Sequence, residues 1–154
     1  AQTRIGKSNI RLQEVTEKGW AFQQKSAPSE GGKGAIDHRH YQHWIDKCSI
    51  RRGYQDCAIE PRIAGTPCFG DVGFRKDDKR HIVQVIAHCD SNITSHVRAA
   101  LIESDAVDVL LFVTPTKLQW DNIRAIIMTD PELVLCMDRI QFDTVETYVK
   151  ELWP

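Results

Sequence analysis

The chain lacks the long apolar segment that a membrane protein needs. No apolar run approaches the roughly 20 residues required to cross a bilayer, and no basic-then-apolar pattern of a secretory signal opens the sequence. Its five cysteines are odd in number and scattered, which does not fit a disulfide framework. From these absences we expect a soluble, cytoplasmic protein with reduced thiols.

The chain also lacks an excess of charge of either sign. Twenty Lys and Arg residues are balanced by twenty-one Asp and Glu residues, for a formal net charge of −1 at pH 7. Nucleic-acid-binding domains are usually basic, so any contact with DNA requires a local patch. Basic residues that could form one, around a predicted helix end and hairpin turn, are Lys47, Arg51, Arg52, Lys76, Lys79 and Arg80. A basic surface that only aids solubility is the simpler explanation.

What is present fits one globular domain preceded by a short segment. A length of 154 residues with 42% hydrophobic content is enough for a real core. Ser, Gly and Pro are concentrated in residues 25–35, which predicts a linker. We therefore expect an N-terminal segment (1–24), this linker, and an α/β domain (36–154).

Hydrophobic periodicity predicts both helices and strands in the α/β domain. The expected order is a helix (36–52), three strands with the last two joined by a turn at Lys76–Lys79, a helix (92–104), an apolar strand (106–115), a helix (118–128), a short buried strand (133–138) and a final helix (142–153). An antiparallel meander that leads into strand-helix-strand crossovers makes a mixed sheet. The order therefore predicts a three-layer α/β fold with helices on both faces of the sheet.

The predicted hairpin within Gly70–Asp90 carries the residues of greatest chemical interest. Metal-dependent nucleases carry such a hairpin with an Asp at the end of one strand and Glu-x-Lys on the next. Here the Asp is Asp71, and the second strand reads Gln84-Val85-Ile86. Because residues i and i+2 of a strand face the same side, we expect Gln84 and Ile86 to lie together opposite Asp71.

The residues of this hairpin suggest a metal site. Its ligands would be Asp71, the side-chain oxygen of Gln84 and the carbonyl of Val85, with Glu60 as a third side-chain oxygen; such ligands suit Mg²⁺ or Mn²⁺. The metal would activate a bound water and neutralise developing charge, and His88, on the same strand face as Gln84, is the candidate base. The alternative is an apolar central strand whose one Gln is satisfied by its neighbours.

A group of histidines with one cysteine suggests zinc as a second metal hypothesis: His38, His40, His43 and Cys48. The group contains no Cys-x-x-Cys or His-x-x-x-His pair, and only His40 and His43 can share a helix face. Two ligands do not close a zinc site. We therefore interpret these residues as a helix surface with one or two histidines packed near the sheet.

Four stretches together resemble a known family: "GGKGAIDHRHYQHWI", "GYQDCAIEPRI", "GDVGFRKDDKRHIVQVIA" and "NITSHVRAALIESDAVDVLLFV". They are similar to restriction-endonuclease-like (PD-(D/E)XK) nuclease domains at the ends of DNA-translocating ATPases and other proteins of conjugative and mobile elements. The resemblance covers roughly residues 31–115. Its specificity comes from the order and spacing of short motifs, and it implies the restriction-endonuclease-like form of the three-layer fold.

The resemblance also implies roles for residues outside the hairpin. It places Asp37-His38-Arg39 at the start of the first helix, beside the hairpin. His38 and Arg39 therefore join Lys76, Lys79 and Arg80 as candidate DNA-binding residues. Separately, "IRLQEVTEKGWAF" in the N-terminal segment resembles the end of a winged-helix domain, as expected for a piece of a longer DNA-associated protein.

Three functions are consistent with these patterns. Replacement of the expected Glu by Gln84, and of the Lys by Ile86, favours a degenerate nuclease-like module that binds DNA or a protein partner without cutting. The alternative is an active Mg²⁺- or Mn²⁺-dependent endonuclease that uses Asp71, Gln84, Glu60 and His88. The third is a protein-interaction or oligomerisation domain with no nucleic-acid role, which the net charge favours slightly.

Overall fold

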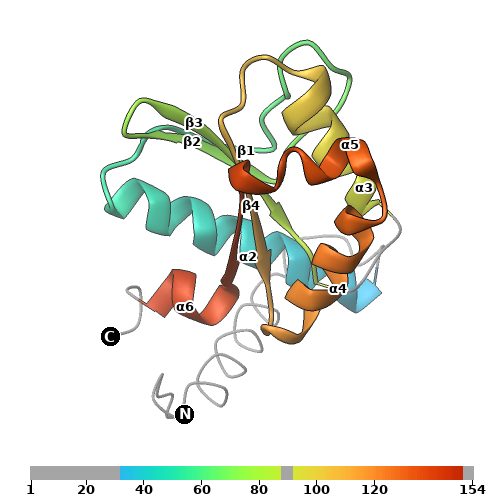
Figure 1. The fold of residues 1–154 in the computed structure, drawn as a ribbon. Coiled ribbons are helices and arrows are strands. Elements are labelled where there is room, and N and C mark those ends of the chain that lie inside the picture. Colours follow the sequence, from blue (N-terminus) through green and yellow to red (C-terminus); the bar gives the residue numbers. More distant parts are fainter. Residues whose placement is uncertain (1–31, 88–91, 151–154) are drawn as a thin grey trace.

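The computed structural model describes residues 32–87 and 92–150, with side chains from His38 onward. These residues form an α/β fold around one five-stranded mixed sheet of order β1-β2-β3-β4-β5 (Figure 1). The strands are β1 (Gln55–Ile59), β2 (Val72–Lys76), β3 (Lys79–Val85), β4 (Val109–Thr114) and β5 (Ile140–Thr144). The first three are antiparallel neighbours, and β4 and β5 run parallel to β3. The predicted α/β class and mixed sheet are confirmed.

Helices cover both faces of the sheet (Figure 1). Helices α2 (Gly32–Arg51) and α6 (Val145–Val149) pack on one face. The other face carries α3 (Ile93–Val97), the π-helix η1 (Arg98–Glu103), α4 (Leu118–Met128) and α5 (Pro131–Val134). None of the helices in the described part of the chain has the length and apolarity needed to span a membrane.

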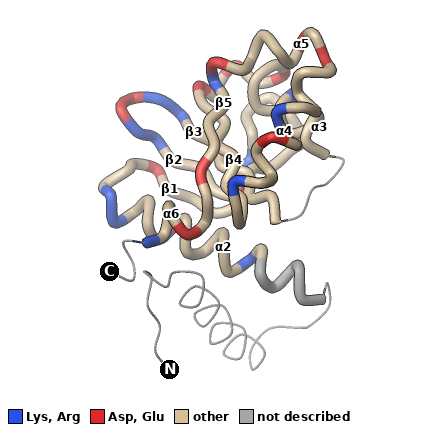
Figure 2. The backbone as a smooth tube through the Cα atoms, turned by 60° about the horizontal axis from the view of Figure 1, so that its bottom comes forward, with Lys and Arg blue, Asp and Glu red and all other residues tan. Residues whose placement is uncertain are grey.

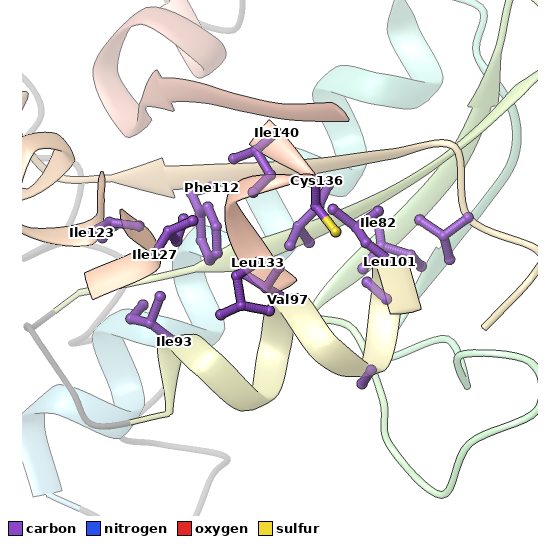
Figure 3. Packing of buried hydrophobic residues seen from close by; sticks show 14 of the residues in the cluster. Ile82, Ile93, Val97, Leu101, Phe112, Ile123, Ile127, Leu133, Cys136 and Ile140 are labelled. Carbon is purple, nitrogen blue, oxygen red and sulfur yellow. The ribbon is translucent and has the colours of Figure 1, made fainter. Parts of the chain in front are cut away.

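Strand alternation divides the core into two clusters. Ile82, Leu110 and Phe112 point toward the layer of α3, α4 and α5. Figure 3 shows Ile82 and Phe112 packed with residues of those helices. On the other face, Val83 and Leu111 pack with residues of α2 and α6. All six residues of β4 are buried, because the strand is covered on both sides. That double burial explains its unbroken apolar sequence.

The β2–β3 hairpin closes through a two-residue turn, as predicted. Lys76 pairs with Lys79, and the residues between them, Asp77 and Asp78, have φ angles of 53° and 63°. Two consecutive positive φ angles are the signature of a type I′ turn. Asp is among the few non-glycine residues that enter this region readily, so the turn forms without glycine.

The strand predicted over 133–138 is wrong. Those residues lie in the end of α5, a turn and the start of the 3₁₀ helix η2 (Met137–Arg139), and the strand follows as β5. The reason is a helix-start signal: Oδ1 of Asp130 accepts the Glu132 N–H at 2.9 Å, and Pro131 occupies the first helical position. The apolar residues Leu133 and Cys136 are then buried at helical spacing.

The predicted boundaries of the first and last helices also need correction. Helix α2 begins at Gly32, so the last residues of the predicted linker 25–35 are helical. Helix α6 begins at Val145 because Thr144 caps it, accepting the Thr147 N–H at 3.1 Å. The N-terminal segment 1–24, with its winged-helix resemblance, lies outside the described residues.

Candidate functional site

Asp71 lies at a β-bulge where β2 begins. The register pairs Val72 with Val83, yet the Asp71 N–H also donates to the Val83 carbonyl, at 2.9 Å. Two consecutive residues of one strand therefore oppose one residue of the other, which defines a bulge. A bulge interrupts the alternation of side chains and re-aims the residue that it contains.

The carboxylate of Asp71 is held on the α2 side of the sheet. Its Oδ2 accepts the Val85 N–H at 2.7 Å and lies 3.3 Å from His38 Nε2. From α2, Gln42 Nε2 donates to the Asp71 carbonyl at 3.1 Å and lies 3.5 Å from Oδ1. The side chain of Asp71 is only 19% exposed. Strand and helix thus fix this carboxylate together.

His38 is the side-chain partner of Asp71 Oδ2. Its hydrogen bond to Asp71 raises the pKa of His38 above the ordinary value. Burial opposes this shift, while the Asp71 charge, the Val85 carbonyl and the charge of Glu60 add to it. The imidazolium form is therefore favoured beside Asp71. His38, predicted to contact DNA, contacts Asp71 within the domain.

Gln84 does not join Asp71. Its side chain is 2% exposed and donates to the Phe69 carbonyl at 3.4 Å, on the face of Ile82 and Ile86. The prediction that Asp71 and Gln84 lie opposite each other on one face is wrong, because the bulge turns Asp71 toward α2. Val85, predicted as a carbonyl ligand, does lie beside Asp71: its N–H donates to Asp71 Oδ2 and its carbonyl interacts with His38.

Among the other predicted site residues, Glu60 contacts Asp71 through its backbone. Glu60 is exposed, with a φ angle of 54°, and its backbone N–H donates to the Asp71 carbonyl at 2.9 Å. The β3 residues on the Asp71 side are Val83 and Val85, which are buried and supply neither a carboxylate nor an amine. His88 and the Asp37 side chain lie outside the described residues.

The residues considered as zinc ligands lie in different environments in the structure. His40 is buried and stacks on Trp44 with ring centroids 5.7 Å apart, whereas His43 is exposed. Cys48 is buried in the core cluster between α2 and the sheet. Within the described residues, no group of three or more His, Cys, Asp or Glu side chains is arranged to hold a metal ion. The geometry therefore offers no support for the magnesium, manganese or zinc hypotheses.

The predicted basic patch is divided between two faces. The end of α2 does meet the hairpin turn: Arg52, Lys76 and Asp77 line one hollow of about 370 Å³. Figure 2 shows basic residues on both strands of the hairpin tip, with acidic residues at the turn. By strand alternation Lys76 and Lys79 lie on the α2 side. Arg80 lies on the other side, where it lines a hollow with Ile82.

The hairpin tip and Asp71 mark opposite ends of β2. At about 3.3 Å per residue, the five steps from Asp71 to Lys76 span roughly 16 Å. Arg39, the other predicted DNA contact, is exposed one residue after His38, at the Asp71 end. The predicted DNA-binding residues thus occupy two ends of the domain.

Sequence reasoning missed the bulge and the role of Gln42. The available signal was the pair of glycines around Asp71-Val72. A Cβ at Gly70 would lie 2.6 Å from Ile82, and one at Gly73 would lie 2.8 Å from Pro61. Glycine inside a strand pattern indicates a bulge or a close backbone approach.

The hydrogen bonds of Asp71 link the start of β2 to β3 and α2. One of its oxygens is shared between an amide and an imidazole, and the neighbouring β3 side chains are apolar. Comparison of the chain with protein-family models, with curated proteins and with solved structures found no match.

Proposed function

We propose that this chain is a nuclease-like module that binds DNA without cutting it, in a DNA-processing or mobile-element protein. The observation that carries the proposal is the engagement of Asp71 by Val85 and His38, next to apolar Val83. Metal-assisted hydrolysis needs ligands that position a cation and activate water. A half-buried carboxylate that already accepts these hydrogen bonds is less available as a metal ligand.

The DNA contact in this proposal is the basic end of the domain. Lys76 and Lys79 lie on the α2 side of the hairpin tip, and the exposed Arg51 ends α2. Lys76 Nζ lies 5.4 Å from the Tyr54 ring centroid, so its ammonium group is held near the surface. Phosphate contacts through such side chains position a duplex without reading its sequence.

Salt dependence measures the number of these contacts. About three phosphate contacts correspond to a slope near −2.7 in a plot of log K against log salt. Affinity should then fall about 40-fold between roughly 50 and 200 mM salt. Fluorescence anisotropy of a labelled duplex gives both the affinity and the slope.

A variant at the hairpin tip and a control at the other end of the sheet locate the contact. We expect the double variant Lys76→Gln/Lys79→Gln to bind more weakly and to reduce the salt slope by about 1.8. The control is Lys117→Gln, because Lys117 follows β4 at the opposite end of the sheet. Absence of binding to any DNA form, or an equal loss in the control, would overturn the proposed DNA contact.

The non-cleaving part of the proposal is tested in the same mixtures. With Mn²⁺ added, the bound DNA is expected to remain intact on a denaturing gel. Protein that neither binds nor cuts DNA would indicate an interaction or oligomerisation domain instead.

A further inference from the structure

A second hollow lies on the face of the sheet opposite α2. Its volume is about 240 Å³, and three arginines surround it: Arg62 after β1, Arg75 on β2 and Arg80 on β3. Its apolar lining includes Ile63, Ile82 and Val107, each at most 3% exposed. The hollow thus combines an apolar floor with a cationic rim drawn from three separate segments.

The rim carries a net positive charge. Among the residues that the structure describes, Asp56 is the one carboxylate that lines the hollow, and its Oδ2 lies 3.5 Å from Nε of Arg75. Arg75 also donates to Oε1 of Gln55 at 3.0 Å. Within the described residues, the guanidinium groups of Arg62 and Arg80 have no carboxylate partner. Three guanidinium charges against one carboxylate give the lining residues a net charge of +2.

Arg62 is held at its guanidinium group, which also lies 6.0 Å from the Phe69 ring centroid, whereas Arg80 is held through its backbone. Nε of Arg62 donates to the Thr66 carbonyl at 3.1 Å, in a loop braced by the Thr66 hydroxyl. Arg80 exchanges backbone hydrogen bonds with Asp108: its N–H donates to Oδ2, and its carbonyl accepts the Asp108 N–H, both at 2.9 Å. These two bonds fix the Arg80 backbone, and the Arg80 side chain lines the hollow.

This combination favours one class of ligand. Guanidinium groups bind phosphate through paired N–H donors, with geometry that a single ammonium cannot offer. The hollow is smaller than the roughly 300–1,000 Å³ of sites for drug-sized ligands, so it suits a phosphate with a short apolar or planar body. We propose that it binds a phosphomonoester of a nucleotide, with the phosphate between Arg62 and Arg80 and the sugar or base against Ile63 and Val107.

This proposal does not depend on DNA binding at the hairpin tip, because the two surfaces lie on different faces. The phosphomonoester could belong to a free nucleotide or to the 5′-phosphate end of a DNA strand. Both present the same dianion, so the choice of probes must separate them.

Calorimetry with matched probes tests the site. We expect deoxyadenosine 5′-monophosphate to bind more tightly than inorganic phosphate, and deoxyadenosine to show no binding. Arg62→Gln and Arg80→Gln should each weaken nucleotide binding about 10- to 100-fold, as expected for loss of charged hydrogen bonds. Lys150→Gln removes the same charge after α6, on the opposite face, and should leave binding unchanged.

A gain-of-charge variant keeps the test valid if an arginine variant unfolds. Ala106 is exposed and lines the hollow, so Ala106→Asp adds a carboxylate without removing a native side-chain contact. It should weaken nucleotide binding by a similar factor. Equal binding of deoxyadenosine, absence of nucleotide binding, or an equal loss in Lys150→Gln would overturn the proposal.

Two oligonucleotides then identify the source of the phosphate. Tighter binding of a 5′-phosphorylated strand than of its 5′-hydroxyl counterpart, with affinity above that of the mononucleotide, would assign the hollow to DNA ends. Tighter binding of the mononucleotide than of either strand would assign it to free nucleotides. Both results support the phosphomonoester site.

Discussion

Replacing Asp71 with alanine tests whether this carboxylate is structural. The change removes the acceptor of the buried Val85 N–H, at 2.7 Å, and the partner of His38, at 3.3 Å. An unsatisfied buried amide costs about 1–3 kcal/mol, and a partly exposed ion pair contributes up to about 1 kcal/mol. We therefore expect the free energy of unfolding to fall by about 3 kcal/mol.

The expected loss is large enough to measure in two ways. For a domain of this size, about 3 kcal/mol corresponds to a decrease in Tm of roughly 10 °C. Urea unfolding followed by tryptophan fluorescence gives the free energy directly. Asp71→Asn keeps an oxygen for the Val85 N–H, so it should lose about half as much. The control is Asp105→Ala, which removes an exposed carboxylate and should change stability by less than about 0.5 kcal/mol.

A metal-site role for Asp71 predicts the opposite pattern. A carboxylate kept for cation binding is not optimised for stability, so its removal is often neutral or stabilising. A bound cation would also raise wild-type stability, by about 2.7 kcal/mol at one hundred times its Kd. Unchanged stability of Asp71→Ala, together with Mn²⁺ stabilisation that the variant loses, would refute the structural role.

Three further changes follow from the same structure. Because Asp71 raises the pKa of His38, the stability from this pair is fully present below the unfolded pKa of about 6.5 and is lost as pH rises through the folded value. Wild type should therefore exceed His38→Gln in urea unfolding by more at about pH 6 than at about pH 9, and a constant difference would contradict this. Phe112 is fully buried, so Phe112→Ala should cost about 3–5 kcal/mol in the same assay, and a cost below about 1 kcal/mol would contradict its place in the core. The buried Ser49 hydroxyl lies 2.8 Å from the Tyr148 hydroxyl. Ser49→Ala should therefore lower the free energy of unfolding by about 1–2 kcal/mol, and by much less in a Tyr148→Phe background. Equal losses in the two backgrounds would contradict this coupling.

Local signals in the sequence predicted most of the fold. The turn at Lys76–Lys79, the apolar strand that became β4 and the helix over 118–128 all follow from residues within one element. The segment 133–138 failed because a short apolar run fits a buried strand and a buried helix equally well. There the capping signal of Asp130 and Pro131 was the better guide.

The candidate site was harder to predict because it depends on strand pairing. Alternation alone put Asp71 and Gln84 on one face, whereas the bulge placed them on opposite faces. Proximity of His38 to the hairpin was correctly anticipated from the resemblance. The sequence could have predicted that the side chains of Lys79 and Arg80 lie on opposite faces of the sheet, because adjacent residues of a strand face opposite sides.

Cleavage is the most direct measurement of the central claim, that this fold binds DNA without cutting it. End-labelled duplex, single-stranded and branched DNA would be saturated with protein in millimolar Mg²⁺ or Mn²⁺ and resolved on a denaturing gel. We predict intact DNA in every lane, equally for wild type and Asp71→Asn. Product that appears with wild type and disappears with Asp71→Asn would contradict the claim and make Asp71 a catalytic residue.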